Sequence, residues 1–452
     1  MSQAAPVLPV ASREKIMHAL YEAAELEHTF MCMYLYAAFS LRSGEEVGLN
    51  AAQADAVNRW RQAMRSIAID EMSHLVAAWN ITSALGGAPR FGRANFPLDP
   101  GYLPAGIVVR LAPFSEAVIQ HFIHLERPYG SDEPDGPGFA SDNGPTRTPV
   151  ALRLTPVGFD YATIGIFYET IGRDLQSLVD AIGEPDLFCG DPALQLSPTE
   201  VDLAGAQPVT DLATALAALN EIIIEGEGAP SHRENSHFRR FIAIREEYRT
   251  LRAEYPDFVP AHPSATNPVL RKPPRPEGHV WLKDADAVST VDLANAVYAL
   301  LLRFLAAAYA VPVSNPDKLL YVDSARGLMH ALAPLAERAA RLPAGPSYPG
   351  CNAGISFTAL RNAASLPPGP SARRFLLERI DELSSVADML DPGDPRCARA
   401  ARVLRSRASS LRDAPMQVGG LLNQSAADRL EAVVRRDCGS SVLPARCVGR
   451  MP

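Results

Sequence analysis

The chain reads Glu71-Met72-Ser73-His74 in one segment and Glu234-Asn235-Ser236-His237 in another, so the motif Glu-x-x-His occurs twice. Residues three positions apart lie side by side on a helix, where a glutamate and a histidine can bind the same metal ion. Each motif continues a stripe of apolar residues at helical spacing, which predicts that both motifs face inward. The sequence therefore predicts two helices that carry metal-binding groups inside a helical core.

A further carboxylate, Glu27, lies on the apolar stripe of a helix predicted over residues 13–41, with Ser12 as its N-cap. The helix with the first motif is predicted over residues 52–85, and the pair of glycines that follows ends it. These two helices are predicted to pack together because both place polar groups on their apolar faces. A shared buried seam follows from that pattern.

Burying a carboxylate costs several kcal/mol unless a cation or a hydrogen-bond partner compensates its charge. Glu27, Glu71 and Glu234 all face this cost, and one pair of metal ions would compensate all three. The alternatives are a buried arginine partner for Glu27 and ordinary core roles for His74 and His237. The coincidence of two motifs and a third buried glutamate favours the metal site.

A third helix is predicted to begin near Asp160, and its candidate ligand is Glu169. Glu169 lies with Gly165 and Gly172 on a face of small residues, which is compatible with close helix packing and with a substrate cavity. Asp160 and Asp174 are weaker candidates.

The fourth helix is predicted to break around Gly226–Pro230 and to resume with the second motif. Glu227, in the break, is predicted to face inward, which makes it a candidate extra ligand, outer partner of a ligating histidine or proton relay. Glu225 is predicted to project to the other side. Tyr34 and Tyr168 are candidate hydrogen-bonding or redox neighbours, so we group them with Glu227 as candidate catalytic residues.

The pattern as a whole is all-α. Residues 1–255 are predicted to form a metal-binding four-helix bundle, within which 88–158 form a long crossover or lid. Residues 256–285 are rich in proline and are interpreted as a linker. Residues 286–412 are predicted to form a C-terminal helical unit, and 413–452 a weakly structured tail.

The composition of the 452 residues limits the classes of partner. A formal charge of -8 disfavours generic binding to nucleic acid or to anionic membranes, so a small-molecule substrate is favoured. The apolar run near 293–313 is interrupted by Arg303, which favours a core helix over a membrane span. Six cysteines without a Cys-x-x-Cys pair, and no secretory signal in the opening residues, predict a cytoplasmic protein.

Five segments carry a resemblance to a known family. In chain order they are LEHTFMCMYLYAAF, IAIDEMSHLVAAWNITSALGG, TIGIFYETI, IIIEGEG and ENSHFRRFIAI. They resemble the bacterial ferritin-like domain family related to iminophenyl-pyruvate dimer synthase of violacein-type biosynthesis, over residues of about 14–250. The resemblance implies a ferritin-like four-helix bundle and the metal ligands Glu27, Glu71, His74, Glu234 and His237. Relatives often have TIGEFY where this chain has Ile166, so the third-helix ligand is either shifted to Glu169 or missing.

Together these features predict a non-haem iron enzyme that uses O2 to oxidise a small organic substrate in bacterial secondary metabolism. Carboxylate and imidazole ligands suit iron, two ions per chain, with manganese as the alternative metal. Ile166 supports one alternative, a catalytically silent scaffold subunit of a biosynthetic oxidase, and a metal-storage protein is another. The further partners considered are a second copy of the chain and a biosynthetic partner enzyme.

Overall fold

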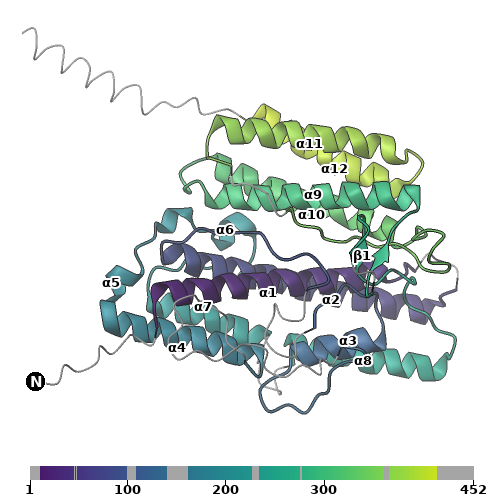
Figure 1. Cartoon of the computed structure of the whole chain (residues 1–452), viewed down its shortest axis with the longest axis horizontal. Coiled ribbons are helices and arrows are strands. Elements are labelled where there is room, and N and C mark those ends of the chain that lie inside the picture. The colour runs from purple at the N-terminus through teal and green to yellow at the C-terminus, as the bar shows by residue number, and fades with distance from the viewer. Residues whose placement is uncertain are drawn as a thin grey trace, which may run out of the picture.

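The computed structural model describes residues 11–44, 46, 48–98, 108–139, 161–226, 234–274, 277–360 and 366–414. These residues are mainly helical, and the described strands are a short parallel pair, β1 (Pro268–Val269) and β2 (Val280–Trp281). Figure 1 shows the long helices α1 and α2 between two groups, with α3, α4, α7 and α8 on one side and α9 to α12 on the other. The predicted all-α class is confirmed.

The centre of the molecule is a hairpin of two long helices, α1 (Arg13–Ser40) and α2 (Ala51–Ala84). Both were expected from their apolar stripes, and local chemistry sets their ends. The side chain of Ser12 caps α1, and Asn50 forms a capping box at the start of α2. Beyond α2, Gly86 has a φ of +85°, a conformation that ends the helix at low cost because glycine has no Cβ.

Each of the other two helices of the bundle is built from two pieces. One consists of α3 (Glu116–Leu125) and α4 (Ile164–Ile182), and the other of α7 (Leu212–Glu225) and α8 (His237–Glu254). The α3 piece packs on α8 and the α4 piece packs on α7, so each pair covers one half of the central hairpin (Figure 1). The C-terminal ends of α3 and α7 therefore approach the N-terminal ends of α4 and α8 at the middle of the bundle.

Three short helices lie between α4 and α7: α5 (Glu184–Leu187), η1 (Pro192–Leu194) and α6 (Pro198–Val201). Asn80 of α2 holds this stretch by donating to the carbonyls of Leu196 and Gln207, at 2.7 and 3.0 Å. The predicted crossover over 88–158 is described only in part, and that part contains α3, which belongs to the bundle itself.

The C-terminal unit consists of α9 (Ala285–Tyr309), α10 (Asp317–Ala339), α11 (Pro370–Leu390) and α12 (Pro395–Asp413). By length and composition α9 could cross a membrane, and it is the one described helix that meets this test. Most of its apolar window is buried in the protein, and α9 packs on α10 and α11. Core packing is therefore a sufficient reason for its apolar sequence.

The proline-rich segment interpreted as a linker is a packed connection between the two groups of helices. The amide of His262 donates to Ser40 O of α1, and the amide of Ala265 donates to Asn352 O, each at 2.8 Å. Proline lowers the number of backbone donors, but these two amides find partners in both helical units. The two helical units consequently share one continuous apolar core.

An ionic cluster joins the connection between α1 and α2 to the C-terminal unit. Glu46 accepts hydrogen bonds from Ser43 N and Oγ at 3.2 and 3.1 Å, lies 3.0 Å from His262 Nε2 and pairs with Arg341. Burial alone would raise the pKa of Glu46, but the hydrogen bonds from Ser43 and the charges of His262 and Arg341 lower it. The carboxylate is therefore stabilised in its charged form in the folded state.

We expect Glu46→Gln to lower the free energy of unfolding by about 1 kcal/mol at pH 7, because the charged partners lose their carboxylate. Since the folded-state pKa is below that of the unfolded chain, the advantage of the native residue is full above the unfolded pKa. It disappears as the pH falls through the folded pKa. Urea unfolding of both proteins between pH 3 and 7 measures this difference, with Glu221→Gln at an exposed position as the control. A difference that persists at the acid end contradicts the expectation.

Candidate metal centre

Five buried side chains meet in the middle of the bundle, where the broken helices end. They are Glu27 of α1, Glu71 and His74 of α2, Glu126 directly after α3, and His237 at the first position of α8. Each is at most 1% exposed. They form two groups, Glu27 with Glu71 and His74, and Glu71 with Glu126 and His237, in which the potential ligand atoms lie within 4.8 Å of one another. Glu71 belongs to both groups.

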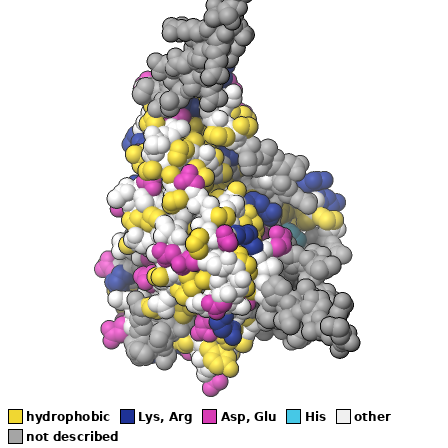
Figure 2. Space-filling view, turned by 90° about the vertical axis from the view of Figure 1, so that its left-hand side faces the viewer, with side chains coloured by type: hydrophobic (Ala, Val, Ile, Leu, Met, Phe, Trp, Pro, Cys, Tyr) yellow, Lys and Arg dark blue, Asp and Glu magenta, His cyan; other side chains and the backbone are white. Residues whose placement is uncertain are grey.

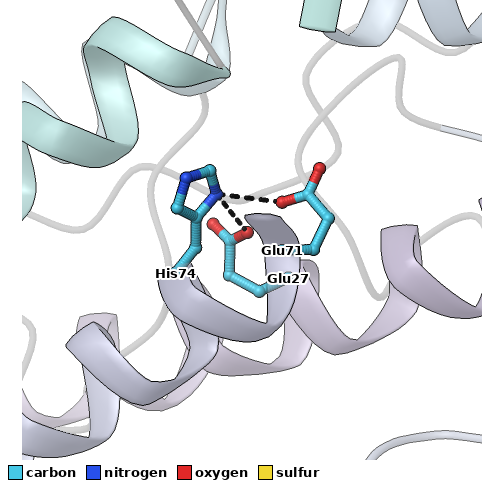
Figure 3. A group of neighbouring side chains, drawn as sticks. All are labelled: Glu27, Glu71 and His74. Atoms are coloured by element: carbon cyan, nitrogen blue, oxygen red, sulfur yellow. Dashed lines mark hydrogen bonds and ion pairs between the residues drawn. The ribbon is translucent and has the colours of Figure 1, made fainter. Parts of the chain in front are cut away.

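Both imidazoles direct Nδ1 toward the shared carboxylate. His74 Nδ1 lies 3.0 Å from Glu71 Oε2 and 3.4 Å from Glu27 Oε2, as Figure 3 shows. His237 Nδ1 lies 3.2 Å from Glu71 Oε1 and 3.5 Å from Glu126 Oε2. Each oxygen of Glu71 thus faces a different histidine, so both groups would share Glu71 if each of them held an ion.

Several of these buried atoms make no well-directed hydrogen bond with the described residues, although oppositely charged atoms lie 3.2–3.5 Å away. They are Glu27 Oε2, Glu71 Oε1, Glu126 Oε2, His74 Nε2 and both ring nitrogens of His237. Buried polar atoms are nearly always satisfied in native proteins, because an unsatisfied one costs about 1–3 kcal/mol. A concentration of such atoms, all of them carboxylate oxygens or imidazole nitrogens, is suited to iron or manganese. The residues therefore fit a pair of metal ions.

The pKa values of the five side chains are shifted because carboxylates and imidazoles are buried close together. Burial raises the pKa of Glu27 to about 8, aided by the charge of Glu71, and burial also raises the pKa of Glu126. Burial alone would raise the pKa of Glu71 and lower that of both histidines. The attraction between the carboxylates and the imidazoles outweighs burial, so the pKa of Glu71 is lowered and the pKa values of His74 and His237 are raised well above the usual value. The cluster attracts positive charge, which protons supply and metal ions can replace.

Two tyrosines hold the outer carboxylates. The hydroxyl of Tyr168 donates to Glu27 Oε1, and the hydroxyl of Tyr34 donates to Glu126 Oε1. Both phenols are fully buried. In each glutamate the phenol fixes one oxygen, and the other oxygen is one of the unsatisfied atoms that face the centre. The two candidate catalytic tyrosines thus occupy matching positions at the two halves of the site.

Two further carboxylates lie behind the histidines. His237 Nε2 is 3.3 Å from Asp70 Oδ2, and His74 Nε2 is 3.5 Å from Glu225 Oε2. Asp70 is itself held by Arg240 Nη1 at 2.7 Å. Carboxylates in such outer positions commonly fix the orientation of ligating imidazoles and raise their basicity. Glu225 therefore faces the site, whereas the sequence predicted that it projects away.

We expect Asp70→Asn to weaken metal binding by about 10–100-fold, because His237 loses the charged partner of its outer nitrogen. Anaerobic titration of metal-free protein with Co(II), followed by its absorption, measures the effect. Asp323→Asn changes an exposed aspartate of α10 and is the matched control. Equal Co(II) affinity of the Asp70 and Asp323 variants would show that the outer carboxylate has no such role.

The structure corrects the predicted position of Glu234. Its side chain is exposed, and it lies in the turn before Ser236, the N-cap of α8. Because the helix begins only at His237, the spacing of the second Glu-x-x-His does not place its glutamate and histidine on one helical face. Among the described residues of this broken helix, Glu225 at the end of α7 approaches the site.

The structure also corrects the predicted position of Glu169. Its side chain is exposed and lines an open groove of about 430 Å³ between α4 and α7, together with Gly172. The inward residue of this turn is its neighbour Tyr168. Asp174, a weaker candidate, pairs with Lys15 at 2.9 Å. Two other candidates, Asp160 and Glu227, lie outside the described residues.

Glu126 is the site residue that the sequence reasoning missed. It follows Phe122 by four positions and Ile119 by seven, so it continues the buried stripe of α3. This is the signal that identified Glu27. The family resemblance implied a carboxylate at the position of Ile166, but α3 supplies an acidic residue opposite Glu71 without it.

A bundle with two inward carboxylate and imidazole groups defines the class of the protein. The sequence profile of the family described as Ferritin-like matches residues 20–246, about half of the chain. The chain therefore belongs to the ferritin-like family, and the predicted resemblance and ferritin-like fold are confirmed.

Two curated proteins and one solved structure are similar to this chain. The 2-imino-3-(indol-3-yl)propanoate dimerase of Chromobacterium violaceum is 28% identical over 422 residues, which are 85% of this chain and 38% of that protein. The dichlorochromopyrrolate synthase of Lentzea aerocolonigenes is 24% identical over 426 residues, 84% of this chain and 39% of that protein. The chain thus spans less than two fifths of the length of these curated relatives. A solved ferritin-like protein from Caulobacter vibrioides aligns with 77% of this chain and all of that chain, at 17% identity and a TM-score of 0.46.

Proposed function

We propose that the protein is a non-haem di-iron enzyme that uses O2 to oxidise a small organic substrate in bacterial secondary metabolite biosynthesis. The observation that carries the proposal is the pair of buried donor groups that share Glu71. The names of the two curated relatives, a dimerase and a synthase of small organic molecules, support the substrate class. Manganese is the alternative metal, since it accepts the same carboxylate and imidazole donors.

Glu27, Glu71 and His74 would hold one ion, and Glu71, Glu126 and His237 the other. When bound, a reduced iron pair supplies the electrons that O2 chemistry requires. The protein supplies a dry environment, because the five donors are buried, and this strengthens every electrostatic interaction in the site.

The chain's own residues also control protons at the site. The hydroxyl of Tyr168 keeps its proton and donates a hydrogen bond to Glu27. The hydroxyl of Tyr34 donates a hydrogen bond to Glu126 in the same way. Each phenol can therefore keep a carboxylate oriented, or pass a proton to it, from a buried position. Glu227 is retained from the sequence as a proton relay.

A catalytically silent scaffold is the second candidate function. Its support was the missing carboxylate at Ile166, and that support is weaker because Glu126 supplies a carboxylate from α3. Metal storage is a third candidate, and the packed C-terminal unit gives it no support. The free thiols of Cys32, Cys189, Cys351 and Cys397 are compatible with the further proposal of a reducing, cytoplasmic location.

Anaerobic titration with Fe(II), metal analysis and O2-uptake measurements on the full chain test the proposal. We expect binding of about two iron ions per chain and consumption of O2 by the reduced protein. Glu382→Gln, on the surface of α11, should behave like the native protein and serves as the control. Retention of many ions per chain would support storage instead, and the absence of binding would support the scaffold.

A further inference from the structure

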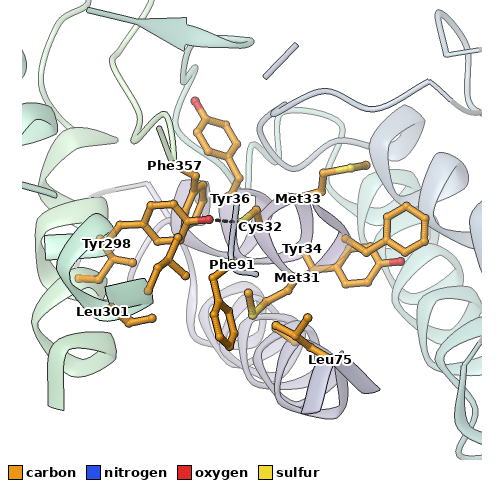
Figure 4. Packing of buried hydrophobic residues seen from close by; sticks show 14 of the residues in the cluster. Met31, Cys32, Met33, Tyr34, Tyr36, Leu75, Phe91, Tyr298, Leu301 and Phe357 are labelled. Carbon is orange, nitrogen blue, oxygen red and sulfur yellow. Dashed lines mark hydrogen bonds between the residues drawn. The ribbon is translucent and has the colours of Figure 1, made fainter. Parts of the chain in front are cut away.

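A second cavity lies on the opposite side of the α1–α2 hairpin from the metal centre. It encloses about 480 Å³ between that hairpin and the helices α9 and α10. Its described lining includes none of the five candidate metal ligands. Figure 4 shows Phe91 and Met31 between Leu75 and the pair Tyr298 and Leu301, whereas Tyr34 points away from Tyr298. The cavity is therefore separate from the centre that Tyr34 contacts.

The inner part of the cavity is aromatic and has one polar pair. The lining includes the rings of Phe91, Tyr309, Tyr298 and Phe357, and the last two pack edge to face with centroids 5.4 Å apart. The hydroxyl of Tyr298 lies 2.6 Å from His28 Nε2, so these two polar groups satisfy each other. The interior thus offers flat apolar surfaces and no unpaired charge, which suits an aromatic ring.

Methionines make the walls adaptable. Met31 of α1, Met72 of α2 and Met329 of α10 all line the cavity. The unbranched, polarisable side chain of methionine can adjust to ligands of different shape and makes favourable contacts with aromatic rings. A cavity of this volume falls within the range of small-molecule sites, about 300–1,000 Å³, and is too small for a folded segment.

Two arginines lie on the lining, and each is paired with a carboxylate. The charged residues among the described lining are Arg65, Arg326 and Asp202, and the exposed His330 follows Arg326 by about one turn of α10. Arg65 pairs with Glu337 at 2.7 Å, about three turns further along α10, so the two arginines mark different parts of the lining. Arg326 and Asp202 form a solvent-exposed ion pair at 3.3 Å, an interaction of little net energy that an incoming anion can replace. Arginine is also the side chain that binds carboxylates best, because its guanidinium group matches their two oxygens.

We propose that this cavity binds a small aromatic molecule that carries an acidic group. The ring lies among Phe91, Tyr298 and Tyr309, and the acidic group lies near Arg326, where it replaces Asp202 as the partner of the guanidinium group. The site does not depend on bound metal or on the proposed oxidative function, because it shares no side chain with the centre. It is a binding site additional to the metal centre.

A fluorescence titration with 8-anilinonaphthalene-1-sulfonate, an aromatic sulfonate, tests the proposal on the folded full chain. The probe is excited where tryptophan does not absorb. We expect one saturable site per chain, with and without Fe(II). Leu301→Trp should weaken binding at least tenfold because the larger ring fills the cavity, and Ala333→Phe is a second filling variant from α10.

Two comparisons decide the outcome. Met389→Trp places the same ring at a 73% exposed position of α11 outside the cavity, and it should leave binding unchanged. Arg326→Gln should weaken binding of the sulfonate more than binding of the uncharged N-phenyl-1-naphthylamine. The proposal is overturned if both filling variants, shown to be folded by circular dichroism, bind the sulfonate as the native chain does. It is equally overturned if binding is multiple and unsaturable, as for general adsorption to the surface.

Discussion

Glu71→Ala is expected to abolish tight binding of both metal ions, the largest effect of any single substitution at the centre. The reason is geometric: Glu71 is the one residue in both donor groups, and its two oxygens face different histidines. Removing it leaves each ion with one carboxylate and one imidazole from its group. Two such ligands bind a divalent ion weakly, because affinity in carboxylate sites rises with the number of charged ligands.

Metal analysis after anaerobic loading with Fe(II), followed by desalting, measures this effect directly. The native chain should retain about two ions and the variant close to none. Glu169→Ala is the matched control, since it removes the same side chain from an exposed position next to Tyr168. Glu71→Ala leaves a cavity that could itself disturb folding. Glu71→Gln keeps the shape of the side chain and should lose the metal as well, so it separates loss of the ligand from an effect of the cavity. Retention of two ions by both Glu71 variants would refute the assignment of Glu71 as a ligand shared by the two groups.

The sequence predicted best where one helix is continuous. Glu27 lies in the middle of α1, and Glu71 and His74 lie one turn apart within α2. Inside an unbroken helix the direction of each side chain is set by its distance along the chain. The apolar stripe therefore reports which residues face inward, and the structure brings these three together.

Prediction failed where the helices are interrupted. The α7 helix ends at Glu225 and α8 begins at His237, so the register of one piece carries no information about the other. The second Glu-x-x-His spans the start of α8, and its letters match a helical spacing that the backbone does not have. The position of Glu126 posed a similar difficulty, because α3 was interpreted as part of a crossover rather than as half of a bundle helix.

The proline-rich connection is a second place where the sequence did not predict the structure. Its composition is typical of a linker, but composition does not reveal which backbone groups find partners after folding. The amides of His262 and Ala265 find theirs on α1 and near Asn352, at opposite sides of the segment. Long-range pairing of this kind depends on how the two helical units meet, which local periodicity does not encode.

Because of these helix breaks, Glu126 is buried at the centre and Glu234 is exposed. This difference leads to the second large expected effect. We expect Glu126→Gln to leave about one tightly bound ion per chain and to weaken the second ion by at least about a hundredfold, more than the loss of an outer partner. Glu126 Oε2 lies 3.5 Å from His237 Nδ1, and Tyr34 holds its other oxygen. Glu234→Gln should change neither site, because that carboxylate is exposed before the start of α8.

Stepwise Co(II) titration of the metal-free proteins separates the two sites, and metal analysis checks the stoichiometry. Both substitutions replace a glutamate with an amide of the same size, so a difference between them reports position and not chemistry. If Glu234→Gln loses an ion while Glu126→Gln keeps two, the spacing of the second motif would be the better guide, and the site would require α8 to begin one turn earlier. Retention of two ions by both variants would mean that Glu126 is a buried neighbour of the second ion and not a ligand.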